Sequence, residues 1–369
     1  MTIHAKSDLL KSERTMPGKM VQFSIGDKAI GKDSPAFIVA EGANNHLGDL
    51  AIAKKMIDAA AQNGADAIKF QTFKAERLVV KDAPIFWKMP GVKTQLDFYK
   101  TIDKFGKKEF QALFRHAKKR GIICFSTPFD CASADMLHEL DMPAFKIASC
   151  DIPDLRLIRH VARFGKPLFI STGASELEEI QRVVETAHAQ GNFKIALLCC
   201  TLSYPTQVAD MNLSRLTTFS RMFPGVIIGL SDHSEPDAQM VLPSLAIALG
   251  AKVIEKHFTL SRKMPGIGHR FCIEPSDLKK MVENIRLTEK ALGCREIKVY
   301  AAEENSRKNA RRSLVANRRI RKGEKLSSVM IGIKRPGTGI SPSAIDNVLG
   351  KIAKHDIEHD SQLTWEQLE

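Results

Sequence analysis

Two histidines each follow a short apolar run, and they lie 24 residues apart in the chain. His233 comes after the run in GLSDHS, and His257 lies near the end of VIEKHF. Runs rich in Val, Ile and Leu without strict alternation are typical of parallel strands that are buried on both faces. Neutral imidazoles on two adjacent strands can share one divalent metal ion. With few carboxylates nearby, such an ion would keep positions open for water and substrate, as a Lewis acid requires.

Two lysines occupy similar places in other apolar runs, Lys69 in AIKFQ and Lys146 in FKIAS. An ammonium group inside a fold is costly unless an anion pairs with it. The apolar runs are followed by further polar side chains: Glu41, Asn45, His46, Gln71, Ser126, Thr127, Ser149, Ser171, Thr172, Thr201, Ser231, Asp232, Glu255 and Lys256. A single threonine there is usually a helix cap, and a single histidine is usually a packing residue. The joint pattern instead predicts one site for an anionic substrate.

These residues need a fold in which many strand ends meet. The chain has eight such apolar runs, at 36–41, 67–71, 122–127, 145–149, 167–172, 195–200, 226–232 and 253–258. Amphipathic stretches separate them, so we predict a (β/α)8 TIM barrel, whose strands all open at their carboxyl ends on one face. A doubly wound open sheet is the alternative. The count of eight and the lack of a GxGxxG turn favour the barrel.

Helix-start signals fit this alternation. Asp49 is expected to cap a first helix that Gly64 ends. Ser175 and Glu178 form a capping-box pattern at the start of another helix, and Ser276 is the expected cap of a third.

Four segments are predicted along the chain. They are an N-terminal arm with a β-hairpin (1–35), the TIM barrel (36–295), a linker (296–308) and a small, mainly β domain (309–369). The hairpin turns at Gly26-Asp27 and is expected to close the bottom of the barrel. A long insertion at 73–106, which contains Trp87, Phe98 and Tyr99, is predicted to be a lid or a contact surface.

Composition excludes several classes of protein. No apolar run is long enough to span a membrane, the first residues do not form a secretory signal, and the seven cysteines contain no CxxC pair. We therefore expect reduced thiols and a cytoplasmic location. The net charge is +13, and residues 306–335 hold eleven Lys and Arg beside one acid, Glu324. That stretch has no aromatic residues for base stacking, so nucleic-acid binding is not expected.

The motifs around these residues identify a family. AEGANNHLGDL is similar to AEIGxNHxG of the sialic acid synthases, which include N-acetylneuraminate, legionaminic and pseudaminic acid synthases. KFQT, FSTPFD, FKIAS, ISTGAS, CTLSYPT, GLSDHS and VIEKHFTL follow in family order and spacing. The tail, with RRSLVANRRIRKGE and KRPGTGISP, resembles the antifreeze-like (SAF) domain, a β-clip fold that ends these enzymes.

The resemblance implies that phosphoenolpyruvate condenses with an N-acylated hexosamine and water, giving a nonulosonic acid and phosphate with C–O cleavage. N-acetylmannosamine is the default sugar, and a diacetamido sugar is the alternative. His233 and His257 would bind a divalent metal, with Mn²⁺ as first choice and Mg²⁺ or Co²⁺ as alternatives. Glu41 would transfer protons. The implied phosphoenolpyruvate ligands are Lys69, Thr127, Lys146, Ser149 and Ser231. Gln71 and Tyr204 would contact the sugar, together with Arg335 of the partner subunit in a domain-swapped homodimer.

Several positions depart from the family pattern. Gly268 replaces an aspartate expected to contact the sugar, Cys199 replaces the histidine of LLHCT, and Leu202 replaces an asparagine found in some members. The acid expected after KIAS is represented by Cys150-Asp151. These changes concern the sugar side of the site and leave the phosphoenolpyruvate side intact.

Rival functions fit the chain less well. An octulosonate or heptulosonate phosphate synthase would share the lysines and the metal, but not the C-terminal domain. A Schiff-base aldolase would use Lys146 as its nucleophile. Ice or glycan binding by the C-terminal domain alone would leave the polar strand ends unexplained.

Overall fold

A computed structural model describes residues 22–85, 91–266 and 268–369. Eight parallel strands close into a barrel in which the last strand pairs with the first. They are β3 (Phe37–Ala43), β4 (Ala67–Thr72), β5 (Ile123–Pro128), β6 (Phe145–Ile147), β7 (Leu168–Ser171), β8 (Ile195–Cys200), β9 (Ile227–Asp232) and β10 (Val253–His257). The predicted TIM barrel is confirmed, and each predicted run corresponds to one of these strands. We call the face at their carboxyl ends the mouth.

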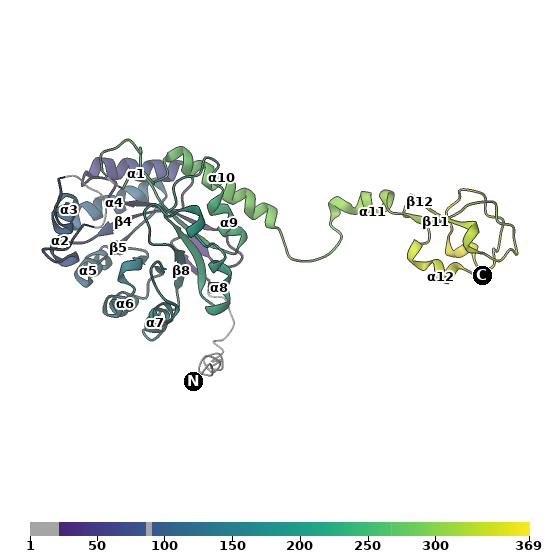
Figure 1. Ribbon diagram of the computed structural model, residues 1–369, viewed down its shortest axis with the longest axis horizontal. Coiled ribbons are helices and arrows are strands. Elements are labelled where there is room, and N and C mark those ends of the chain that lie inside the picture. The colour runs from purple at the N-terminus through teal and green to yellow at the C-terminus, as the bar shows by residue number, and fades with distance from the viewer. Residues whose placement is uncertain (1–21, 86–90, 267) are drawn as a thin grey trace, which may run out of the picture. The chain divides into compact units, whose positions relative to one another are not determined.

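Helices surround the barrel as an outer ring (Figure 1). They are α1 (Leu50–Gln62), α4 (Lys107–Arg120), α5 (Cys131–Glu139), α6 (Leu155–Ala162), α7 (Leu177–His188), α8 (Arg215–Met222), α9 (Leu242–Ala248) and α10 (Pro275–Leu292). Their buried residues recur at helical spacing, as in α7, where Ile180, Val183, Val184 and Ala187 face inward.

Of the three predicted helix caps, one is confirmed and two are wrong. Asp49 caps α1 by accepting from the amides of Ala51 and Ile52. Helix α7 starts one residue later than predicted, because Glu179 accepts from the amide of Glu176 and so fixes the capping box there. Helix α10 starts earlier, with Glu274 as its cap, because a proline at the next position is already suited to the first helical residue.

The N-terminal hairpin consists of β1 (Phe23–Ile25) and β2 (Lys28–Ile30), which pair antiparallel around the predicted turn. The Phe23 ring lies edge-on to Phe169, at 6.5 Å between ring centroids. Phe169 also stacks on Phe37 and Phe125 inside the barrel. Phe37 and Phe169 lie at the N-terminal ends of β3 and β7. The hairpin therefore covers the end of the barrel opposite the mouth, as predicted. The predicted N-terminal arm, residues 1–21, lies outside the described residues.

The insertion after β4 forms α2 (Ala75–Leu78) and α3 (Gln95–Ile102). Its base is held by Asp103, which accepts from Lys74 Nζ at 2.6 Å and from the Ala75 amide at 2.9 Å. Tyr99 of α3 packs edge-on against Phe73, with ring centroids 5.4 Å apart. Trp87, which was predicted to belong to this surface, lies outside the described residues.

The remaining residues form a second compact unit, and the division falls between Gly293 and Cys294. This unit contains α11 (Glu304–Ala310), the antiparallel strands β11 (Ser313–Ala316) and β12 (Ile331–Lys334), and α12 (Ile345–Val348). Its own core includes Leu314, Ile320, Leu326, Val348 and Leu363. Among the described residues, no helix is both long and apolar enough to cross a membrane.

Candidate functional site

Lys69 lies at the centre of the mouth and is buried together with its partners. Its Nζ is 2.7 Å from Glu41 Oε2 and donates to Thr127 Oγ1 at 2.9 Å. These residues come from the adjacent strands β3, β4 and β5. The register pairs Glu41 with Lys69, and Thr127 lies two residues beyond Phe125, the β5 partner of Lys69, on the same face. The structure thus brings together three residues that the sequence predicted for the site.

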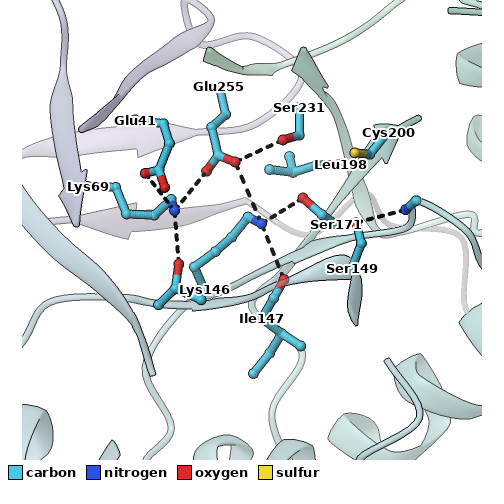
Figure 2. Close-up of polar contacts among 12 residues, drawn as sticks. Glu41, Lys69, Lys146, Ile147, Ser149, Ser171, Leu198, Cys200, Ser231 and Glu255 are labelled. Carbon is cyan, nitrogen blue, oxygen red and sulfur yellow. Dashed lines mark hydrogen bonds and ion pairs between the residues drawn. The ribbon is translucent and has the colours of Figure 1, made fainter. Parts of the chain in front are cut away.

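Lys146, on β6, is the second buried lysine of the site and has its own set of polar contacts. Its Nζ donates to Ser171 Oγ at 2.6 Å and to the Ile147 carbonyl at 3.2 Å. Figure 2 shows Glu255 between the two lysines, 3.8 Å from Lys69 Nζ and 3.6 Å from Lys146 Nζ. Glu255 also accepts a hydrogen bond from Ser231 at 2.9 Å. We call Glu41, Lys69, Lys146 and Glu255 the lysine network.

Burial and neighbouring charges set the protonation of this network. Burial raises the pKa of Glu41 to about 7, although Lys69 opposes the shift. Burial also acts to raise the pKa of Glu255, but Lys146 and Lys69 outweigh it and hold that pKa below its usual value. Burial lowers the pKa of Lys146. The two carboxyl groups therefore differ: Glu255 remains an anion, whereas Glu41 can exchange a proton near neutral pH.

The two predicted metal-binding histidines lie next to each other on β10 and just after β9. Their ring centroids are 5.2 Å apart. Burial lowers the pKa of His233 to about 4 and that of His257 well below the ordinary range, so both rings are neutral. His233 Nδ1 is 3.0 Å from the Thr201 carbonyl, which can only accept, so Nδ1 carries the hydrogen and Nε2 keeps its lone pair.

This donor set fits a divalent ion with an open coordination sphere. No group of three or more His, Cys, Asp or Glu suited to a metal occurs in the part of the chain that the structure describes. An ion held by His233 and His257 alone would have two protein ligands and would keep several positions for water or substrate, which suits a Lewis acid.

Gln71 and Tyr204, predicted to contact a sugar, border the same site. Gln71 Nε2 is 3.4 Å from Glu41 Oε1, and its Oε1 accepts from Asn44 at 2.7 Å. Tyr204 stacks on His233, with centroids 4.2 Å apart, and is 48% exposed. A half-exposed aromatic ring over a histidine pair is suited to packing against a polar ligand that enters from solvent.

Known proteins share both units of the chain. A model of the NeuB family matches residues 56–297, and a model of the SAF domain matches residues 311–369. The chain belongs to the NeuB family. N,N'-diacetyllegionaminic acid synthase of Legionella pneumophila is 36% identical, over 93% of this chain and 98% of its own. Human N-acetylneuraminate-9-phosphate synthase is 32% identical, over 91% and 94% respectively.

A solved structure agrees with this assignment. Crystalline N-acetylneuraminic acid synthetase from Leptospira borgpetersenii, in complex with citrate, is 34% identical with a TM-score of 0.71, and the match covers 79% of this chain and 96% of that chain. The present chain is thus a NeuB-type synthase, an enzyme with a TIM barrel and a SAF domain. The predicted family is confirmed.

The structure shows what surrounds the three residues that depart from the NeuB-family pattern, Gly268, Cys199 and Leu202. A Cβ atom at Gly268 would lie 2.8 Å from Asn45 Oδ1, while Asn45 Nδ2 donates to the Phe258 carbonyl at 2.8 Å. Any side chain at 268 therefore needs Asn45 or the loop to move. Cys199 is buried in the barrel core, and burial raises the pKa of its thiol. Leu202 is 38% exposed.

Three further residues that the sequence singled out are Ser149, Asp151 and Arg335. Ser149 Oγ accepts from the Gly173 amide at 2.9 Å, next to the lysine network (Figure 2). Burial, with Asp154 nearby, raises the pKa of Asp151 to about 7. Arg335 is exposed on the second unit, directly after β12.

Sequence reasoning included Glu255 among the polar strand ends but gave it no role in the site. The alternation of side-chain directions along β10 could have indicated this role. Side chains two residues apart on a strand share a face, so Glu255 must lie on the same face as His257.

Proposed function

We propose that this enzyme condenses phosphoenolpyruvate and water with an N-acylated hexosamine, N-acetylmannosamine by default, to give a nonulosonic acid and phosphate. One observation carries the proposal: two buried lysines with nearby hydroxyl groups lie beside a pair of neutral histidines in a NeuB-family barrel. The first group suits a phosphorylated carboxylate, and the second suits a metal-assisted reaction of an aldehyde.

Lys69, Thr127, Lys146, Ser149 and Ser231 would hold phosphoenolpyruvate. Lysine and hydroxyl groups donate hydrogen bonds to carboxylate and phosphate oxygens, and they do so most strongly where water is excluded. Lys69 and Lys146 are each only 2–3% exposed. The same donors can stabilise the charge that develops as phosphate leaves.

His233 and His257 would hold the divalent ion, with Mn²⁺ as first choice and Mg²⁺ or Co²⁺ as alternatives. When bound, the ion would polarise the aldehyde of the open-chain sugar. Gln71 and Tyr204 would orient the sugar while the enol carbon of phosphoenolpyruvate attacks it. Glu41, with its pKa near 7, would transfer the proton of the attacking water or of the sugar hydroxyl.

The assembly that we propose is a domain-swapped homodimer in the cytoplasm, in which Arg335 of the partner subunit reaches the sugar. All seven cysteines are free thiols, which fits a reducing compartment. Mixing a His233→Ala protein with an Arg335→Ala protein tests the exchange. Recovered activity in mixed dimers is expected, and the lack of any recovery would contradict it.

Phosphate release from phosphoenolpyruvate tests the reaction. The sugars would be N-acetylmannosamine, its 6-phosphate, and the diacetamido sugars that lead to legionaminic and pseudaminic acids, each with and without Mn²⁺. Metal-dependent release with one sugar is expected, and His233→Ala should abolish it. His160→Ala is a matched control, because His160 bonds Asp135 on the helical ring and not in the mouth. No release with any of these sugars would refute the proposal.

A further inference from the structure

Glu255 is an anion placed inside a site for anions. Its carboxylate lies 3.6 Å from Lys146 Nζ and 3.8 Å from Lys69 Nζ, beyond hydrogen-bond distance of either. It is 4% exposed, so the charges act on one another with little screening by water. A phosphorylated ligand that binds both lysines therefore meets a fixed negative charge between them.

Glu255 accepts a hydrogen bond from the barrel strand beside it, whereas its contacts with the two lysines are longer ion pairs. Ser231 donates to Glu255 Oε1 at 2.9 Å, and the two residues are direct partners in the pairing of β9 with β10. Glu41 differs, because it contacts Lys69 directly at 2.7 Å. A ligand can replace Glu41 as the close partner of Lys69, but Glu255 has no close lysine contact to give up and stays in place.

We propose that Glu255 is a positioning residue that acts as the shared counter-charge of Lys69 and Lys146 and limits the affinity of the site for phosphate, so that the product can leave. This inference rests on the proposed function, because it assumes that phosphate is released between these lysines. A carboxylate between the two lysines repels any anion that binds to them, so it weakens the binding of phosphate.

Glu255→Gln gives a sharp test, because glutamine has nearly the same shape and its amide oxygen can still accept from Ser231. Inorganic phosphate should bind the variant at least about tenfold more tightly, since a buried charge that repels it is gone. In turnover, KM for phosphoenolpyruvate and kcat should both fall, because the substrate binds more tightly and the product leaves more slowly. A merely structural role would not move KM in this direction.

The measurement is calorimetric titration of wild type and variants with inorganic phosphate and, separately, with phosphoenolpyruvate. Asp58→Asn is the matched control, because it removes one carboxylate from the helical ring, where Asp58 pairs with His116 and Arg120. Its phosphate affinity should equal that of wild type. Equal tightening in both variants would overturn the proposal, because it would reflect net charge alone.

Unchanged or weaker phosphate binding by Glu255→Gln would also overturn the proposal. If that variant fails to fold, Glu255→Asp replaces it. The shorter side chain draws the charge back from both lysines, so intermediate tightening is expected, and unchanged affinity would contradict the idea. Wild type that binds neither ligand would instead refute the proposed function, and this inference with it.

Discussion

Two kinds of buried lysine occur at the ends of the barrel strands. Lys256 has a partner for each of its three hydrogens: Asp232 Oδ2 at 2.7 Å, the Ser234 carbonyl at 2.8 Å and Ser234 Oγ at 3.1 Å. Lys69 and Lys146 each have two partners within 3.2 Å and a more distant carboxylate, Glu255. A saturated lysine holds the fold together, whereas an unsaturated one can still donate to a ligand.

Strand alternation separates these two kinds. Asp232 and Lys256 are partners in the pairing of β9 with β10, and so are Ser231 and Glu255. Successive residues on a strand point to opposite faces. Ser231 and Glu255 therefore point into the mouth, whereas the ion pair of Asp232 with Lys256 lies on the opposite face of the two strands.

The largest expected effect is on stability, at the saturated pair. Asp232→Asn leaves Lys256 buried without a counter-charge, and we expect it to lower the free energy of unfolding by about 3–5 kcal/mol. Denaturant unfolding followed by circular dichroism measures this. Adding Lys256→Met should restore most of the loss, because the orphaned charge is then removed as well. If Asp232→Asn alone is as stable as wild type, the ion pair of Asp232 with Lys256 has no structural role.

At Lys146, one of the two unsaturated lysines, a substitution should reduce activity rather than stability. Lys146→Met removes a proposed donor to the leaving phosphate, and kcat/KM for phosphoenolpyruvate should fall about 10²–10³-fold. The melting temperature should stay close to that of wild type, because Glu255 keeps Lys69 as a counter-charge. Steady-state phosphate release and calorimetric melting provide the two readouts. A large loss of stability with little loss of activity would reverse the assignment of the two kinds of lysine.

Glu41 should make stability depend on pH. Its pKa is raised to about 7, so the folded state binds its proton more tightly than the unfolded state does. That stabilisation is fully present below the ordinary pKa, 4.5, and is lost as pH rises through about 7, with a slope of no more than about 1.4 kcal/mol per pH unit. Unfolding of wild type and Glu41→Gln across this range should converge at low pH and diverge as it rises. Parallel curves would contradict the shift.

The smallest effect should come from a neutral partner of the lysine network. Ser171→Ala removes one hydrogen-bond partner of Lys146, a loss of about 1 kcal/mol. We expect KM for phosphoenolpyruvate to rise about fivefold with little change in kcat. Steady-state kinetics with varied phosphoenolpyruvate measures both parameters. A fall in KM would show that the serine competes with the substrate for the lysine.

Much of this arrangement follows from the sequence, because the eight apolar runs fix the order of the strands. Once the barrel closes, parallel register pairs Glu41 with both Lys69 and His257, and it places Thr127 two residues beyond the strand partner of Lys69, on the same face. The helix starts at Glu176 and Glu274 were less predictable. Near each start, several acidic residues and serines within one or two positions could act as the N-cap, and a proline also influences where α10 begins.

Contacts that involve loops were the least predictable. The close approach of Asn45 to Gly268 joins the loop after β3 to the loop after β10, and loop geometry is not encoded in any periodic pattern. The role of Glu255 depends on distances of 3.6–3.8 Å to two lysines on other strands, which register alone does not give.

The central claim is that phosphate leaves from phosphoenolpyruvate by C–O cleavage. Phosphoenolpyruvate labelled with ¹⁸O at its bridging oxygen tests this directly, in a reaction with Mn²⁺ and the sugar that supports release. Mass spectrometry should find the label in inorganic phosphate and none of it in the sugar acid, because water supplies the new oxygen at that carbon. Label retained in the sugar acid would mean P–O cleavage and would contradict the account.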